Sequence, residues 1–314
     1  MSKPLFIKKM AVMVAIESVV GTIVVPVATD AIRVSDVTLT PIEGDEVEEN
    51  VIRPFFGASE STLVTLYRKI AFSVGFAGVK NKGDLPGWAM LMRACAASVT
   101  HTPAPDPDAG TVFAPVTDDI ESVTIYGVID KQLYKMAGAR GNVKAQVDAK
   151  GIPKWQFEFT GGFFPVEEVA QMPAVNYGKF MTPLGVNKLN TTLKLDGFDA
   201  ACNSFAFDFG NTVVKQDLMN VDTTEITGRK STGSATFRNT GVSTKNWIEM
   251  ARASAKVPLL LKHGQGATNT VSIAAPIVQL GKPTFADQDG IQMITVPLRF
   301  IPTDAGNDEW SIAV

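Results

Sequence analysis

Histidines, cysteines and clustered acidic side chains are the residues that would carry nucleophilic or metal-assisted chemistry in this sequence. It holds only two histidines, His101 and His263, and two cysteines, Cys95 and Cys202. Neither histidine stands near a cysteine or an acidic residue at the spacing of a metal-ligand set. The two cysteines cannot make a disulfide framework, so they predict free thiols in a reducing compartment. We therefore expect no catalytic residue, no metal site and no cofactor.

Two short motifs resemble fragments of ligand-binding loops, and each lacks a residue that its chemistry needs. Gly78 and Gly83 have the first spacing of a phosphate-binding P-loop, but Asp84 stands where that loop requires lysine. The run Asp287–Gly290 resembles part of a calcium loop without its third acidic ligand and terminal glutamate, so a hairpin turn explains it better. The sequence also has no Gly-x-Ser-x-Gly elbow. These patterns predict a protein that is not an enzyme.

The elements that would position any site come in two copies, one in each half of the chain. A basic pair followed after six residues by phenylalanine occurs at Arg68-Lys69 and Phe76. The same pattern returns 161 positions later at Arg229-Lys230 and Phe237. Duplicated units favour assembly through similar surfaces, because one chain then supplies two members of a ring. The repeat therefore favours an architectural role over catalysis.

Each copy continues into one amphipathic helix. In the first half Trp88 begins a pattern of apolar residues at i, i+3, i+4 and i+7, and Trp247 begins the same pattern in the second half. Arg93 and Arg252 follow the two tryptophans at the same distance. We expect the two helices to bury equivalent faces, with Trp88, Arg93, Trp247 and Arg252 as their anchors.

The remaining segments alternate with a period of two, which is typical of strands with one buried face. Examples are Trp155, Phe157 and Phe159 in the first half and Ile294, Val296 and Leu298 in the second. The sequence thus predicts a mainly β protein with two tandem antiparallel β-sandwich or barrel domains, each with one flanking α-helix. The expected domains are residues 1–164 and 165–314, with the boundary in a proline-punctuated stretch at about 164–184.

Composition limits the partners of the chain. It carries 29 Lys+Arg against 32 Asp+Glu, a formal net charge of -3, which argues against a strongly basic nucleic-acid-binding face. Only 19% of residues are charged and 45% are hydrophobic, so neighbours are expected to cover much of the surface. The uncharged stretch Ser18–Thr29 is shorter than the ~18 residues that span a bilayer, and we expect no membrane association.

An acidic segment in the first half has no counterpart of similar charge in the second. It has three interpretations: a solvated loop, a hairpin arm at about residues 43–62 that reaches a neighbouring subunit, or an acidic surface at the lumen that repels phosphate. The candidate contact residues of this arm are Asp45, Glu46, Glu48 and Glu49. The basic pairs Arg68-Lys69 and Arg229-Lys230 lie at repeat-equivalent places, and we expect them to form inter-subunit ion pairs with those acids.

A series of short motifs runs in one order through residues 6–162. They are Lys9, Ile16-Glu17, Pro26, Asp30-Ala31, Thr40-Pro41, Arg53-Pro54, Gly57, Pro86, Arg93-Ala94-Cys95, Ser122-Val123-Thr124, Gly138-Ala139-Arg140-Gly141-Asn142 and Phe157-Glu158-Phe159. In this order they resemble the tail tube, or major tail, proteins of long-tailed bacteriophages, closest to those of transposable phages with non-contractile tails. The rest of the chain shares the resemblance only through the internal repeat.

This resemblance implies a domain of two packed antiparallel sheets flanked by one helix. It implies self-assembly into stacked rings around a channel for double-stranded DNA, with a tape measure protein and a tail terminator as partners. The location would be the virion tail, assembled in the bacterial host cytoplasm. A conduit should not retain its cargo, so we expect an inner wall that is neutral or acidic and binds no phosphate.

Two domains in a chain change the expected stoichiometry of the ring. Three chains would supply six domains and close a pseudo-sixfold ring, and a hexamer with the second domain outside is the alternative. Two other functions stay open from the sequence. One is a two-domain β-sandwich binding module such as a virion or surface adhesin, and the other is the tube of a contractile injection apparatus.

Overall fold

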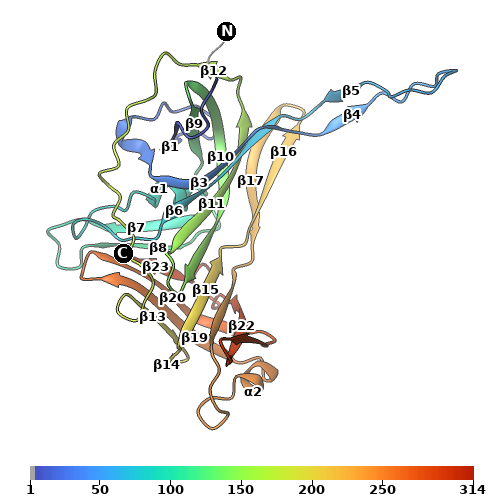
Figure 1. The fold of residues 1–314 in the computed structure, drawn as a ribbon. Helices are drawn as coiled ribbons and strands as arrows, with labels where there is room; N and C mark the ends of the chain where they lie inside the picture. Colours follow the sequence, from blue (N-terminus) through green and yellow to red (C-terminus); the bar gives the residue numbers. More distant parts are fainter. Residues whose placement is uncertain (1–3) are drawn as a thin grey trace.

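The computed structural model describes residues 4–314, and these residues form a mainly β protein with 51% of residues in strands and 5% in helices (Figure 1). The two α-helices are α1 (Ala89–Arg93) and α2 (Trp247–Arg252). Within the described residues no helix combines the length and the apolar character needed to cross a membrane. The mainly β, antiparallel character predicted from period-two patterns is therefore confirmed.

An eight-stranded antiparallel layer forms the centre of the protein. Its strands follow one another in the order β3 (Val34–Glu43), β6 (Tyr67–Gly75), β11 (Lys154–Phe163), β10 (Gln132–Asp148), β15 (Cys202–Asp208), β18 (Thr232–Arg238), β22 (Ile291–Phe300) and β21 (Thr284–Gln288). No strand pair joins β3 to β21 within residues 4–314, so this layer has two free edges.

The sequence repeat is also a repeat of strand order. The first four strands, β3, β6, β11 and β10, are followed in the same order by β15, β18, β22 and β21. A two-stranded hairpin lies between the first two strands of each set, and a helix and a further hairpin follow the second strand. The hairpins are β4 (Glu46–Glu48) with β5 (Ser61–Leu63), β16 (Asn211–Leu218) with β17 (Val221–Arg229), β7 (Ala97–Thr102) with β8 (Gly110–Pro115), and β19 (Lys256–Gln265) with β20 (Asn269–Leu280).

The two halves join side by side rather than folding as separate sheets. Strand β10 pairs with β11 on one side and with β15 on the other, where Lys144 lies opposite Asp208 and Val147 opposite Phe205. A second connection pairs β8 with β23 (Ser311–Ala313). The predicted linker region has no helix or strand over residues 169–190. The division into domains 1–164 and 165–314 stays a prediction.

The remaining strands extend the layer on the first half and flank the second. They are β1 (Met10–Ile16), β2 (Ala31–Ile32), β9 (Val123–Ile129), β12 (Glu167–Glu168), β13 (Thr191–Leu195) and β14 (Phe198–Asp199). A short 3₁₀ turn, Ala28–Asp30, precedes β2.

One face of the eight-stranded layer packs against the core. Alternate residues of each central strand are buried on this face, and their aromatic rings stack, as with Phe76 and Trp155 at 4.4 Å between centroids. In the second half Phe207 and Phe300 pack with tilted ring planes at 4.7 Å between centroids. The opposite face is polar, as the period of two requires. The predicted turn at Asp289-Gly290 is confirmed, since the amide of Gly290 donates to Asp287 at 2.8 Å.

Candidate functional site

The candidate functional site is an extended surface, and its largest part is the polar face of the eight-stranded layer, here called the polar sheet face. Small neutral side chains dominate it. The residues that alternate with the buried ones on the six central strands are Lys69, Ala71, Ser73, Lys154, Gln156, Glu158, Thr160, Asn142, Lys144, Gln146, Asp148, Ser204, Ala206, Asp208, Thr232, Ser234, Thr236, Thr295, Pro297 and Arg299. Cations and carboxylates nearly balance on this face.

Ion pairs within the chain neutralise several charges of the polar sheet face. Lys144 pairs with Asp208 across the joint between the halves at 3.1 Å. Lys154 pairs with Asp36 at 2.6 Å, and this hydrogen bond holds the pKa of the Asp36 carboxyl below its ordinary value. A shallow hollow of about 340 Å³ lies between these groups. The face can therefore contact a charged polymer without presenting a cluster of unpaired positive charge.

The two free edges are the second part of the site. Strand β3 pairs only with β6 and strand β21 only with β22 among the described residues. Both edge strands leave backbone groups unpaired, which makes them able to accept a further strand. On β21 the Phe285 ring is 53% exposed, although it is a large apolar side chain. A strand of another chain could therefore extend the layer at either edge.

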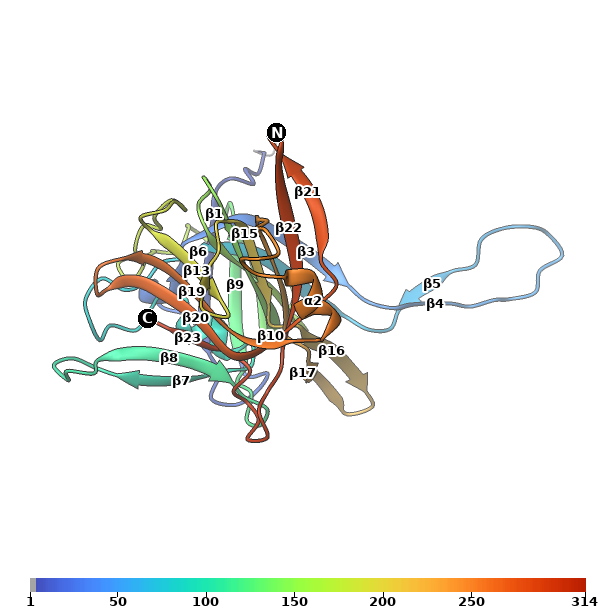
Figure 2. The same ribbon diagram turned by 90° about the horizontal axis from the view of Figure 1, so that it is seen from below.

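The third part is the arm, defined as residues 44–66 around β4 and β5. Figure 2 shows it reaching away from the rest of the molecule, so the projecting hairpin predicted from the acidic segment is confirmed. Its far end exposes Ile52, Phe55 and Phe56, with Phe56 fully in solvent. Asp45, Glu46, Glu48 and Glu49 lie on its stem and are exposed. No ion pair within residues 4–314 involves these four acids.

The second hairpin, β16–β17, occupies the equivalent place in the other half but packs against the first half. The Asn211 side-chain amide donates to the carbonyl oxygens of Cys95 at 2.8 Å and Gly141 at 3.1 Å. Arg140 donates to the Thr224 carbonyl at 2.7 Å and also pairs with the carboxylate of Glu225. These contacts fix the base of the hairpin on α1 and β10.

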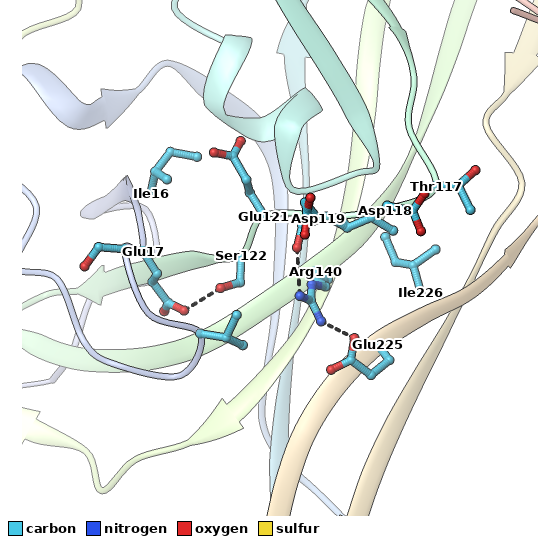
Figure 3. A pocket seen from close by; sticks show the side chains of 13 residues that line it. Ile16, Glu17, Thr117, Asp118, Asp119, Glu121, Ser122, Arg140, Glu225 and Ile226 are labelled. Carbon is cyan, nitrogen blue, oxygen red and sulfur yellow. Dashed lines mark hydrogen bonds and ion pairs between the residues drawn. The ribbon is translucent and has the colours of Figure 1, made fainter. Parts of the chain in front are cut away.

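An open hollow of about 870 Å³ lies beside this contact, and five of its thirteen lining residues are acids (Figure 3). Glu17 is buried at its edge and accepts hydrogen bonds from the hydroxyls of Ser122 at 2.6 Å and Thr124 at 2.8 Å. The amides of Gly21 and Gly138 donate to the same carboxylate at 2.8 and 2.9 Å. Since so many donors hold it, Glu17 organises the loops around it.

The predicted inter-subunit role of the two arginines is wrong, because both are engaged inside the chain. Arg68 is fully buried and donates to the carbonyls of Pro41, Lys135 and Phe164 at 2.8, 2.6 and 3.1 Å. Arg229 pairs with Glu309 at 2.5 Å. A buried cation needs hydrogen-bonding partners, and both arginines find these partners in the backbone and side chains of their own chain. Their neighbours Lys69 and Lys230 are half-buried and exposed, and their inter-subunit pairing stays a prediction.

The two helices differ in burial, which corrects the expectation of equivalent buried faces. Trp88 and Trp247 are both 2% exposed, so the two tryptophans do anchor the helices. In α1 Leu91 and Met92 are also fully buried, whereas in α2 Trp247 is the only buried residue. Arg93 pairs with Glu121 and Arg252 with Glu249, each within the chain.

The uncovered side of α2 forms a groove of about 690 Å³ against the ends of β20 and β22, here called the α2 groove. Ile248, 55% exposed, lies on its helical wall, and Leu280 lies at its floor. Arg252, Lys282 and Arg299 stand around it, and no acidic residue lines it. The groove is thus apolar with a basic rim.

The thiols and histidines do not form a reactive centre. Burial raises the pKa of the Cys95 thiol well above its ordinary value and that of Cys202 to about 12, so both are poor nucleophiles. Burial also lowers the pKa of His263, whose Nδ1 lies 2.7 Å from the Thr191 hydroxyl. Within residues 4–314 no three His, Cys, Asp or Glu side chains gather as metal ligands would.

Sequence reasoning missed the edge strand β21 and the α2 groove. The basic residues Lys282 and Arg299 are isolated in sequence and meet only because β20, β21 and β22 pair. The polar sheet face carried a usable signal, since the residues between the buried aromatics of β11 and between the buried Val143, Ala145 and Val147 of β10 are all polar. No protein-family model matches this chain, and no curated protein matches it in sequence.

Proposed function

We propose that the chain is a structural virion protein that assembles into stacked rings and forms a phage-type tail tube, a conduit for double-stranded DNA. The observation that carries this proposal is the pairing of β10 with β15, which joins two copies of one four-stranded unit edge to edge. The outer edges of the pair, β3 and β21, are the repeat equivalents of β15 and β10. A joint that occurs once inside the chain is therefore available between chains.

The repeat gives the register of that joint. Inside the chain Gln146 of β10 lies opposite Ala206 of β15. Their repeat equivalents are Thr284 of β21 and Ser35 of β3, as their pairing with β22 and β6 shows. In the same register Phe285 would lie opposite Val34 of the next copy, where Val147 lies opposite Phe205 within the chain. The exposed Phe285 ring would then be covered.

A ring closed by pairing of β21 with β3 of the next chain can contain only certain numbers of chains. A heterologous contact between opposite edges closes into a ring when the rotation allows it. Three chains supply six repeats and a pseudo-sixfold ring, which is the size we propose, with six chains as the alternative.

The polar sheet face would line the channel of such a ring. Its charges are nearly balanced and partly paired, through Lys144 with Asp208 and Lys154 with Asp36. A wall that neutralised phosphates would release counterions at every ring and hold the DNA in place. A nearly neutral wall of threonine, serine, glutamine and asparagine instead lets the duplex slide. The virion tail, with tape measure and terminator proteins as further partners, is the setting that this role implies.

Engineered cysteines test the joint and count the chains in one experiment. The double variant Ser35→Cys with Thr284→Cys, oxidised after assembly, is expected to give cross-linked species that stop at three chains on a denaturing gel. Negative-stain images of the same sample are expected to show rings or tubes. The single variants are controls that cannot link in series. Monodisperse single chains without cross-links would overturn the proposal, and a ladder that stops at six would replace the trimer by the hexamer.

A further inference from the structure

We propose that the α2 groove binds the base of the arm of a second copy of this chain, the segment Leu39–Glu43. This inference rests on the proposed self-assembly and adds a contact outside the sheet joint. Two independent observations carry it. One is the contact that the equivalent segment makes inside the chain, and the other is the complementary charge of the groove and the arm.

The internal contact shows how such a segment sits. After β15 ends, the amide of Phe209 donates to the carbonyl of Val143 at 3.1 Å. The amide of Asn211 then donates to the side chain of Asn142 at 3.0 Å, and its own side chain reaches the carbonyl of Cys95 beyond α1. Phe209 and Cys95 are fully buried as a result. The base of one hairpin thus closes the space beside the helix of the other half.

The residues that receive this segment have repeat equivalents in the α2 groove. Asn142 and Val143 lie opposite Glu158 and Phe157 of β11, just as Gln279 and Leu280 lie opposite Arg299 and Leu298 of β22. Cys95 follows α1 at the place where Ser254 follows α2, since their amides donate to Met92 and Ala251. Gln279, Leu280 and Ser254 all line the α2 groove. The α2 groove is therefore the repeat equivalent of the space beside α1. The base of the β16–β17 hairpin fills that space, whereas no segment of residues 4–314 fills the groove.

The segment that would fill it is also defined by the repeat. Asp208 of β15 lies opposite Thr232 of β18, and Thr38 of β3 lies opposite Ala71 at the equivalent place of β6. Leu39 and Pro41 consequently correspond to Phe209 and Asn211. Leu39 is only half-buried and Pro41 is exposed in the single chain, so both have surface left to bury.

Charge complementarity points to the same occupant. The rim of the groove carries Lys282 and Arg299 beside Arg252, which pairs with Glu249 of its own helix, and no acid lines the groove. The segment enters the acidic stem of the arm, where Glu43 and Asp45 come first. In the internal contact Arg140 of β10 holds Glu225 of the hairpin in the same way. A groove with an apolar floor and a basic rim fits this segment, since its own apolar residues lead into acids.

Mixed single-cysteine variants test the contact directly. Pro41→Cys chains mixed with Ser254→Cys chains and oxidised are expected to form a two-chain product that neither variant forms alone. A parallel mixture of Ser35→Cys and Thr284→Cys chains reports the sheet joint separately. If the joint forms and the groove pair does not, the groove proposal is overturned while the proposed function stands. If neither forms, both fall.

Charge reversal gives a second readout that needs no cross-link. Lys282→Glu with Arg299→Glu is expected to reduce assembly at low salt at least tenfold, as measured by sedimentation. Mixing with chains that carry Glu43→Lys and Asp45→Lys should restore part of it. Lys188→Glu, a reversal of an exposed lysine outside the groove, is the matched control and should assemble like the parent. Equal losses in the control and the groove variant would overturn the proposal.

Discussion

Helices α1 and α2 begin from the same sequence pattern and end in different surroundings. Each is anchored by a tryptophan that is 2% exposed, and each is followed by a β-hairpin. Around α1, strand β1 and the base of the β16–β17 hairpin cover the remaining apolar residues. Around α2 no segment of residues 4–314 takes that place, and Ile248 stays 55% exposed.

This difference shows that the burial of the apolar residues of α1 and α2 depends on which segment packs against each helix, and not on the helix sequence alone. The β16–β17 hairpin lies against the half that precedes it, and within residues 4–314 no equivalent surface lies against the arm. One chain therefore contains one complete joint between repeats and two unmatched halves of a joint. The comparison between the two helices can be sharpened by substitutions at equivalent and non-equivalent places.

The largest effect is expected at the shared anchors. Trp88→Ala and Trp247→Ala should each lower the free energy of unfolding by about 3–5 kcal/mol, because each removes a buried indole and leaves a cavity. Urea unfolding of unassembled chains would measure both. Similar losses would confirm that the two helices share one packing rule. An unchanged midpoint in either variant would break the equivalence of the repeats.

A smaller effect, and a contrast between the helices, is expected beyond the anchors. Leu91→Ala in α1 should cost about 2–5 kcal/mol, since Leu91 is fully buried. Ile248→Ala in α2 should change stability by less than about 0.5 kcal/mol in the unassembled chain, because its side chain lies mostly in solvent. The same Ile248→Ala chains should assemble less well. Equal destabilisation by the two changes would show that α2 is covered within the single chain.

The smallest effect concerns His263, which lies in strand β19. His263 is buried, and burial lowers its pKa below the ordinary value of 6.5. Below pH 6.5 the unfolded chain therefore binds a proton at this residue more readily than the folded chain does. Stability should fall as pH drops from 7.5 to 5.5, by at most about 1.4 kcal/mol per pH unit for this group. His263→Gln should flatten the profile. A profile that His263→Gln leaves unaltered would exclude this group.

Local sequence patterns predicted those structural features that depend on residues close together in the chain. The two helices, the turn at Asp289-Gly290 and the projecting acidic hairpin follow from tryptophan spacing, turn residues and an uncompensated run of acids. Pairing between β10 and β15 could not be predicted, because the alternation of buried and exposed residues sets the face of a strand and not its partner.

The candidate site shows the same limit. The repeat-equivalent position of Arg68 and Arg229 predicts a subunit contact for Arg68. Its actual partners are carbonyl oxygens from Pro41, Lys135 and Phe164, which are distant in the chain and converge only in the fold. The exposure of the apolar side of α2 could not be predicted for a related reason. Met250 and Ala251 are spaced for burial, but whether anything covers them depends on other segments.

The inequality of the two hairpins has a consequence for any protein that would bind to the outside of the proposed tube. In a ring of identical single-unit subunits every projection would be the same, and the outline would repeat six times. Here the arm and the compact β16–β17 hairpin would alternate around the circumference. A protein that recognises the long arm would meet it at every second position, so the two unequal halves would give the proposed three-chain ring a threefold pattern of binding points.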